Sequence, residues 1–264
     1  MKPARFWSLR WILTTLLVIA GVGVLIRLGI WQLDRLAQRR AFNERVSAQI
    51  TASELDLNHY TDLNAKLFDM EYRNAVVHGQ YDFTQEVLLR NQALDGKLGF
   101  HVLTPLRIAN SDQTVLVDRG WIPFDQASPE KRQQYQEPGE VTVQGAIRRP
   151  QTKPDFGGVA DPTLAPGETR VDAWNIVNLE RIQQQIDLSL LPVYIVQAPD
   201  TAWTGLPVRQ LVMPEITEGP HLGYAMQWFT FAAILGLGYP FFVCKQLRLA
   251  GKTVKNLEIE RESA

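Results

Sequence analysis

The sequence predicts two transmembrane α-helices, N- and C-terminal, flanking one exported, mainly antiparallel β domain, barrel- or sandwich-like, with short helices. Two stretches, 11–31 and 223–244, are apolar, and Arg27 is the only charged residue in either. A helix rises about 1.5 Å per residue, so about 20 such residues cross the hydrocarbon core of a bilayer. Between these stretches, short runs of alternating apolar and polar residues are separated by Gly, Pro, Asn and Asp, a pattern typical of β-strands.

The charges around the second stretch predict the orientation in the membrane. Four basic residues follow it, and the segment before it carries only acidic ones close by: Lys245, Arg248, Lys252 and Lys255 against Glu215 and Glu218. Lys and Arg near a span stay on the cytoplasmic side. The first stretch has basic residues on both sides, so the second decides. We therefore expect segments 1–10 and 245–264 in the cytoplasm and the domain 32–222 outside.

The cysteine count and the net charge exclude several kinds of function. Cys244, the only cysteine, lies at the cytoplasmic end of the second stretch, so the domain has neither disulfides nor a cysteine metal cluster. The net charge of −1 argues against a nucleic-acid partner. The first stretch has an alternative interpretation as a cleaved signal peptide ending at Ala20. Its apolar character continues past that point, which favours an uncleaved anchor.

The domain is predicted to begin with a continuation of the first helix, because apolar residues keep helical spacing as far as Val46. Short helices are expected at 53–57, 61–68, 129–135 and 179–186, and a long loop at 153–167. Eight strands are expected, at 72–81, 86–92, 99–108, 114–120, 141–148, 170–177, 193–197 and 207–213. In the second span, Pro240 is expected to bend or end the helix.

The sequence lacks the usual signatures of catalysis. It contains no nucleophile elbow, no His-Glu-x-x-His zinc site, no phosphate loop and no Cys-x-x-Cys. His59, His78 and His101 are scattered, and we interpret them as ordinary surface or edge residues. An exported hydrolase is the rival class, and it would need an acid–base pair from the available carboxylates, which are Glu71, Asp118, Glu140 and Asp172. Their spacing shows no such pairing.

One histidine stands out because of its place in the chain. His221 directly precedes the second span, and on a helix it shares a face with Tyr224, Ala225 and Trp228. An imidazole flanked by aromatic rings at a membrane interface suits the iron of a planar apolar cofactor such as haem. The alternative is that it simply lies at the interface, as Trp and Tyr do. Gln32 and Gln227 are polar residues near the outer ends of the spans, and one interpretation is that they hydrogen-bond between the helices. For Gln32 the alternative is that it begins the solvated extension.

A second motif lies in the middle of the domain, where Gly120-Trp121-Ile122-Pro123 ends a strand-like run. The glycine permits a positive φ or close packing where the strand turns, and the proline forbids continued pairing. A structural role is favoured over contact with a ligand. Asp118 and Arg119 alternate across the strand, and the pattern leaves open whether they pair with each other or with partners elsewhere.

Three motifs together resemble the Surfeit/Shy family of cytochrome c oxidase assembly factors, in their bacterial form. They are GIWQLDRL at Gly29–Leu36, VDRGWIP at Val117–Pro123 and HLGYAMQWF at His221–Phe229. The resemblance covers the whole chain, with the motifs in family order. Trp31, Gln32 and Arg35 match the first motif, Gly120 the second, and His221 the third.

The resemblance implies a non-enzymatic role in the bacterial inner membrane, with a periplasmic domain. Such proteins assist insertion of haem a into the large subunit of the haem–copper oxidase, with the histidine at the second span as the favoured haem ligand. We therefore expect His221 to hold haem iron, with Tyr224, Trp228 and Trp31 in apolar contact and the β domain capping the site. Expected partners are the oxidase large subunit, a haem a synthase and the lipid bilayer. The alternative is a scaffold that stabilises an oxidase subunit without binding haem.

Overall fold

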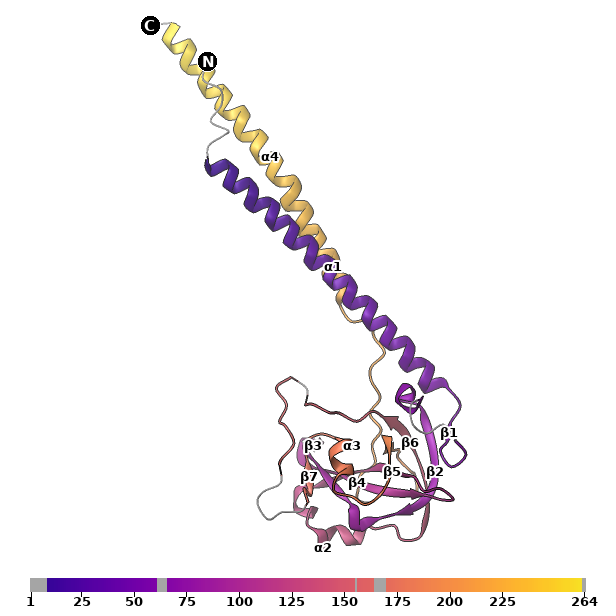
Figure 1. Cartoon of the computed structure of the whole chain (residues 1–264). Helices are drawn as coiled ribbons and strands as arrows, with labels where there is room; N and C mark the ends of the chain where they lie inside the picture. Colours follow the sequence, from indigo (N-terminus) through magenta and orange to yellow (C-terminus); the bar gives the residue numbers. More distant parts are fainter. Residues whose placement is uncertain (1–8, 61–65, 155, 164–169, 263–264) are drawn as a thin grey trace. The chain divides into compact units, whose positions relative to one another are not determined.

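The computed structural model describes residues 9–60, 66–154, 156–163 and 170–262 (Figure 1). They divide into two compact units, the domain Arg45–Glu215 and the pair of helices that precede and follow it. Parts of the predicted segments 1–10, 61–68, 153–167 and 245–264 lie outside the described residues. The described part of 153–167 has neither helix nor strand, as expected.

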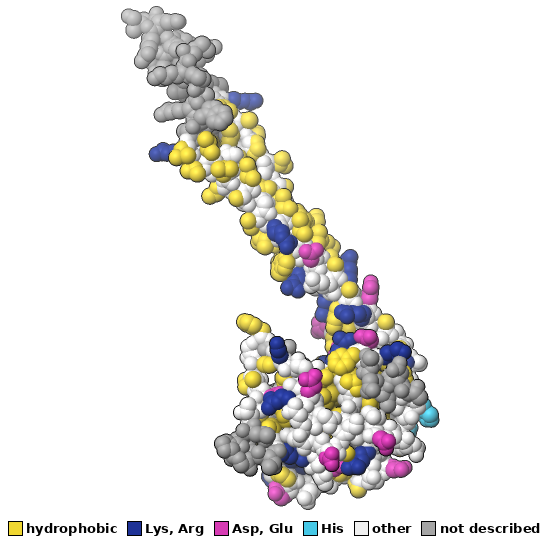
Figure 2. All heavy atoms as spheres, viewed as in Figure 1, with side chains coloured by type: hydrophobic (Ala, Val, Ile, Leu, Met, Phe, Trp, Pro, Cys, Tyr) yellow, Lys and Arg dark blue, Asp and Glu magenta, His cyan; other side chains and the backbone are white. Residues whose placement is uncertain are grey.

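Two long helices, α1 (Leu9–Thr51) and α4 (His221–Glu262), contain the predicted spans. Both are long and apolar enough to cross a membrane, and only 6% of each apolar window is buried, unlike the core helix of a soluble protein. The 43 residues of α1 extend about 65 Å, roughly twice the hydrocarbon thickness of a bilayer. The helix therefore continues past its apolar part, as the spacing up to Val46 predicts. Figure 2 shows hydrophobic side chains over these helices.

Of the two outcomes predicted at Pro240, a bend or an end of the helix, the end is wrong, because α4 continues past Pro240 to Glu262. Proline removes one N–H, and its ring crowds the carbonyl four residues earlier. Here that residue is Gly236, which has no side chain of its own to add to the crowding. Proline inside an apolar membrane helix is tolerated where neighbouring groups satisfy the freed carbonyl.

The domain is a closed, mainly antiparallel sheet with two-residue strands added at its margins. The strands are β1 (Leu55–Asp56), β2 (Asn74–Tyr81), β3 (Val87–Leu94), β4 (Lys97–Ile108), β5 (Thr114–Pro123), β6 (Glu140–Arg148), β7 (Ala173–Trp174) and β8 (Leu190–Gln197). Pairing runs β2–β6–β8–β5–β4, and β4 pairs again with β2, which closes a barrel. The β5–β8 pairing is parallel. The predicted barrel-like alternative is therefore the observed one.

Short helices connect the strands: η2 (Lys66–Met70), η3 (Phe83–Gln85), η4 (Phe124–Gln126), α2 (Pro129–Arg132), η5 (Gln133–Tyr135) and α3 (Leu179–Gln183). The helical predictions at 129–135 and 179–186 are confirmed, although the second helix ends three residues early. Alternate residues of the barrel strands point inward. Val77, Leu106, Val117 and Ile195 are among the fully buried residues of the largest core cluster, which is why the period-two pattern located these strands.

Three local predictions are wrong. Within the predicted helix 53–57, Leu55–Asp56 form the short parallel strand β1 against β2. Only Ala173–Trp174 of the predicted strand 170–177 pairs as a strand, and 207–213 contributes only the bridge Trp121–Val208. In each case the residue pattern of the short segment was compatible with extended backbone or a helix. The neighbouring strand that was available for pairing decided which backbone hydrogen bonds formed.

Candidate functional site

The pair α1–α4 packs through small residues. A Cβ on Gly29 would lie 2.6 Å from the ring of Phe229, so only glycine lets the ring approach this closely. A Cβ on Gly21 would lie 3.3 Å from Leu235. Ala225 and Ala232 are buried, which places that side of α4 against its neighbour. Helices in membranes associate through such small residues because close backbone approach maximises van der Waals contact.

His221, the first residue of α4, forms a hydrogen bond with the other helix of the pair. Its Nδ1 lies 2.9 Å from Oε1 of Gln32. An amide oxygen accepts but does not donate, so Nδ1 carries the proton and donates it. In a neutral ring Nε2 is then the nitrogen with the free lone pair. It has no hydrogen-bond partner among the described residues. Gln32 therefore fixes both the orientation and the tautomer of the imidazole.

The predicted hydrogen bond between helices is thus present at Gln32, with His221 as its partner. Gln227 is exposed on α4 and does not take part in this contact.

The aromatic residues predicted to flank the histidine are only partly covered. Tyr224 is 48% exposed and Trp31 is 43% exposed, so both rings present a free face. The Trp31 ring has the guanidinium of Arg35 at 5.6 Å from its centroid. Trp228 meets Phe231 edge to face, with centroids 6.1 Å apart. Apolar rings with free faces are suited to contact with a planar apolar molecule.

The backbone just before His221 is tied to α1. Arg40 makes a bidentate pair with Glu218, at 2.7 and 3.0 Å, and this hydrogen bond lowers the pKa of Glu218. The side chains of Arg39 and Asn43 donate to the carbonyl of Thr217, at 2.9 and 3.0 Å. These contacts fix where α4 begins relative to α1. They therefore position His221 opposite Gln32.

The donor set fits haem. A neutral imidazole with Nδ1–H bonded to a carbonyl-type oxygen and Nε2 free is a common state of a metal-ligating histidine. His221 is the only histidine of the helix pair. The other three lie in the domain, where each contacts a side chain: His59 with Asp56, His78 with Thr142 and His101 with Asp118. The helix pair thus offers one histidine that would hold haem iron.

The histidines of the domain differ in exposure. The interpretation of His59 and His78 as surface residues is confirmed. His101 is different, since only 23% of its side chain is exposed and Asp118 lies 2.7 Å away. No group of three or more His, Cys, Asp or Glu in the part of the chain described here could hold a metal ion.

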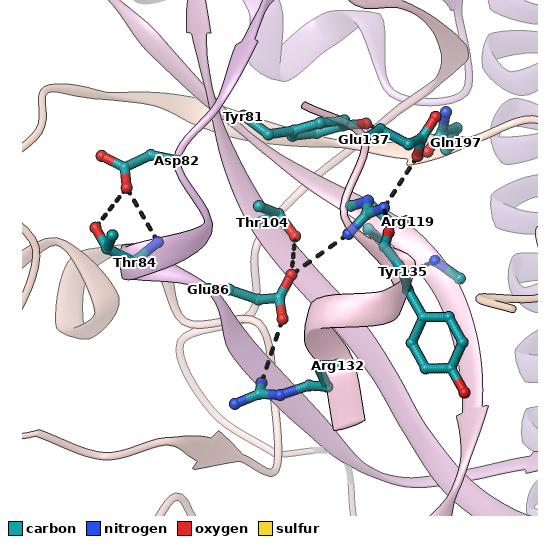
Figure 3. Close-up of polar contacts among 12 residues, drawn as sticks. Tyr81, Asp82, Thr84, Glu86, Thr104, Arg119, Arg132, Tyr135, Glu137 and Gln197 are labelled. Atoms are coloured by element: carbon teal, nitrogen blue, oxygen red, sulfur yellow. Dashed lines mark hydrogen bonds and ion pairs between the residues drawn. The ribbon is translucent and has the colours of Figure 1, made fainter. Parts of the chain in front are cut away.

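A buried ionic cluster lies inside the domain around Arg119, which is 1% exposed (Figure 3). Its guanidinium pairs with Glu86 at 3.5 Å and Glu137 at 3.0 Å, and also donates to the carbonyl of Tyr135. Tyr81 and Phe83 lie against it, with ring centroids 5.0 and 5.2 Å from the guanidinium carbon. Arg119 therefore pairs with residues on other elements, whereas its neighbour Asp118 contacts His101.

Gly120 forms a β-bulge, and the prediction that the strand would end there is wrong. Two residues of β5, Arg119 and Gly120, oppose one residue of β4, and pairing then continues to Pro123. Gly120 has φ +120, and a Cβ there would lie 2.7 Å from the carbonyl carbon of Val208. The bulge turns the backbone of Trp121 toward Val208, with which it exchanges hydrogen bonds of 2.9 and 2.7 Å. The structural role predicted for Gly120 is confirmed.

The sequence did not single out the other members of the cluster, namely Glu86, Thr104, Arg132, Glu137 and Arg209. Thr104 donates to Glu86 at 2.7 Å, and Arg209 donates to Glu137 at 2.7 Å. One signal was present, because Glu86 directly precedes the apolar pair Val87-Leu88 of a strand. Burial raises the pKa of Glu86, against the opposing effects of Thr104 and the two arginines.

The four carboxylates considered for a hydrolase are engaged separately or exposed. Asp118 contacts His101 and accepts from the backbone N–H of Gly120, and Asp172 lies 3.4 Å from Arg132. Glu71 lies 3.5 Å from Arg148, and Glu140 is exposed. These contacts do not pair any two of the four.

Comparison with known proteins gives a consistent result. A "SURF1-like protein" of Caenorhabditis elegans is 24% identical over 247 residues, 86% of this chain and 73% of the relative. A "SURF1-like protein" of Rickettsia felis is 25% identical over 240 residues, 87% and 96% of the two chains. "Surfeit locus protein 1" of Xenopus tropicalis is 24% identical over 248 residues, which are 88% of this chain and 76% of the relative. The model of the SURF1 family matches residues 19–233, which include all three motifs, and the chain belongs to the SURF1 family.

Proposed function

We propose that this protein is a membrane-anchored, non-enzymatic assembly factor for a haem–copper cytochrome c oxidase, and that it holds haem a through His221 during insertion into the large subunit. Under this proposal it resides in the bacterial inner membrane, with both termini cytoplasmic and the β domain periplasmic. Its partners are the oxidase large subunit and, as the source of the cofactor, a haem a synthase. Membership of the SURF1 family supports the assembly role, and the two apolar helices support the membrane location.

The observation that carries the haem part is the hydrogen bond between His221 and Gln32. This hydrogen bond orients the imidazole and leaves Nε2 as the nitrogen with a free lone pair. That lone pair is what ligates iron. A hydrogen bond to the other ring nitrogen also makes the ligand more basic. Haem held here by His221 would be the cargo that is passed on for insertion.

The chain's own residues hold this cargo weakly, which suits a carrier. One imidazole is available in the helix pair, and the flanking rings of Tyr224 and Trp31 keep about half of their surface exposed. Gly29 contributes indirectly, because it lets α1 and α4 approach closely enough for Gln32 to reach His221. A site with one ligand and open walls releases its cargo more readily than a closed pocket with two.

The test is an optical spectrum of the purified full-length protein after co-expression with haem a synthesis. The wild type should show a haem band, and His221→Ala should lose it. His59→Ala is the matched control, since that exposed histidine lies in the β domain and its ring contacts Asp56. A colourless wild type, or a His221→Ala variant with an unchanged band, would refute haem ligation and leave the scaffold alternative.

The role of Gln32 has a separate test. Gln32→Leu removes the acceptor and should weaken haem retention by about 10–100-fold, the usual cost of losing a hydrogen bond to a metal-ligating histidine. Gln32→Glu keeps an acceptor and should retain haem, with a shifted spectrum because the ring becomes more basic. Equal retention by Gln32→Leu and wild type would contradict the positioning role without affecting the assignment of His221.

A further inference from the structure

The β domain contains a polar cavity that the proposed function does not use. It has a volume of about 590 Å³ and lies where the end of β2, η3 and the α2–η5 segment meet. Buried Glu86 and Arg132 form part of its wall, and Arg107, whose side chain is 60% exposed, lies at its rim. Figure 3 shows Glu86 between Arg132 and Arg119, so the cavity wall is continuous with the buried ionic cluster.

Positive charge exceeds negative charge inside this cluster. Three guanidinium groups, those of Arg119, Arg132 and Arg209, are at most 8% exposed. They share two carboxylates, Glu86 at 8% and Glu137 at 23% exposed. Asp172 also approaches Arg132, but its side chain is 53% exposed and is screened by water. Burial of an excess positive charge is costly unless an anion compensates for it.

The hydrogen bonds of the arginines are also incomplete. Five buried guanidinium nitrogens of this region have no hydrogen-bond partner in the described structure: Nε of Arg119, Nε and Nη1 of Arg132, Nε of Arg170 and Nε of Arg209. Native proteins leave few buried polar atoms unpaired, because each such atom is destabilising. Two of the five are on Arg132, which lines the cavity, so an acceptor bound in the cavity would lie within their reach.

Arg132 is the arginine that a ligand can reach. It is 7% exposed and belongs to the wall of the cavity. Its contacts with Glu86 and Asp172 are long, 3.5 and 3.4 Å, whereas a charge-assisted hydrogen bond measures about 2.8 Å. Its guanidinium is therefore held near the cavity without being saturated by the protein.

We infer that this cavity binds a carboxylate group, with Arg132 as its principal partner and Arg107 at the entrance. A single negative charge matches the excess of one in the cluster. A doubly charged phosphate fits less well, because Asp82 and Glu86 also line the cavity. A carboxylate accepts two hydrogen bonds from a guanidinium in a fork-like arrangement.

The cavity is much larger than a carboxylate, so the ligand brings a larger body with it. The side chains of Gln80, Gln133 and Gln136 line the cavity, are exposed, and have no hydrogen-bond partner in the described part of the chain. Amides donate and accept, which suits either the backbone of a peptide or the polar groups of a small organic acid. The shared chemistry is the carboxylate, and its source is a question for the experiment.

The test is isothermal titration calorimetry of the full-length protein in a non-ionic detergent. Three probes are compared: the monocarboxylate butyrate, the capped peptide acetyl-Gly-Glu-Gly-amide, and its Gln counterpart. We expect saturable binding of a carboxylate probe and none of the Gln peptide. Preference for the Glu peptide over butyrate would identify a protein partner as the source, and equal or better binding of butyrate would identify a small acid.

Two variants locate the site. Arg132→Gln should weaken binding by about 10-fold or more, because a hydrogen bond to a charged group is lost. Arg107→Gln, at the exposed rim, should weaken it less and is expected to fold normally. Arg149→Gln is the matched control, because its pairing with Asp69 lies away from the cavity. No binding of either carboxylate probe, equal binding of the Gln peptide, or binding unchanged in both variants would overturn the inference.

Discussion

Replacement of Gly120 by alanine tests the account of the mid-domain motif. The residue lies in the bulge of β5 with φ +120, a conformation that side chains disfavour. The added methyl group would also lie 2.7 Å from the carbonyl carbon of Val208, a backbone atom that a rotamer change cannot move away. Two separate costs therefore apply at this position.

The magnitude follows from these two costs. A non-glycine residue in such a conformation costs about 1–3 kcal/mol. Moving Val208 away breaks its pair of hydrogen bonds with Trp121, of 2.9 and 2.7 Å, at about 0.5–1.5 kcal/mol each. We therefore expect Gly120→Ala to lower the free energy of unfolding of the domain by about 2–6 kcal/mol.

Two other glycines separate the costs. Gly139 has φ +89, but no atom of the described residues lies within 4 Å of its added Cβ, so Gly139→Ala carries the backbone cost alone. Gly205 has neither feature, and Gly205→Ala should be within about 0.5 kcal/mol of wild type. The assay is thermal unfolding of the full-length protein in detergent, followed by tryptophan fluorescence and near-UV circular dichroism.

The decisive comparison is between the first two variants. We expect Gly120→Ala to unfold below Gly139→Ala by the steric part of the cost, about 1–3 kcal/mol or roughly 2–12 °C for a domain of this size. Equal melting temperatures would refute the argument that the approach of Val208 is what requires glycine. Unfolding of Gly205→Ala as early as the others would show that any methyl group in these loops is harmful.

Two further predictions concern other parts of the molecule. Burial alone would lower the pKa of His101, but the hydrogen bond and charge of Asp118 outweigh it and raise that pKa. The stability that this pair contributes is present below about pH 6.5 and is lost as pH rises through the pKa of His101 in the folded state. Between pH 6 and 8 the melting temperature of wild type should therefore fall more steeply than that of His101→Gln. Parallel curves of melting temperature against pH would contradict this. Gly29→Leu should separate the helices at Phe229 and destabilise the pair by about 1–3 kcal/mol. Gly23→Leu should not, because no atom of the described part of the chain lies within 4 Å of a Cβ at Gly23. Loss of far-UV helicity on heating measures the difference, and equal effects of the two would argue against close packing at Gly29.

The elements that the sequence predicted well are those with a long periodic pattern. The apolar stretches at 11–31 and 223–244 lie within α1 and α4, and the period-two runs locate β2 to β6 and β8. These patterns reflect which face of an element avoids water, a property that each segment carries by itself. Residues 53–57 and 207–213 were mispredicted because they are short, and their conformation depends on pairing with β2 and with Trp121.

The candidate haem site was partly visible in the sequence. The residue type of His221 and its position at the start of an apolar helix were enough to single it out. Its partner was not predictable, because Gln32 and Gln227 were equally plausible donors or acceptors near the span ends. The spatial register of α1 against α4, set where Gly29 admits Phe229, selected Gln32.

Patterns along the chain were enough to predict the two apolar helices, the β character of the segment between them and the likeness of its three motifs to one family. The folded domain was needed to show that the sheet closes into a barrel, that Arg119 lies buried beside Glu86, and that Arg132 lines a cavity and has unpaired nitrogens. The two sets of features differ in the range of the interactions behind them. Hydrophobic periodicity is local in the chain, whereas the pairing of a buried charge depends on residues that are distant in sequence and become neighbours only when the strands close.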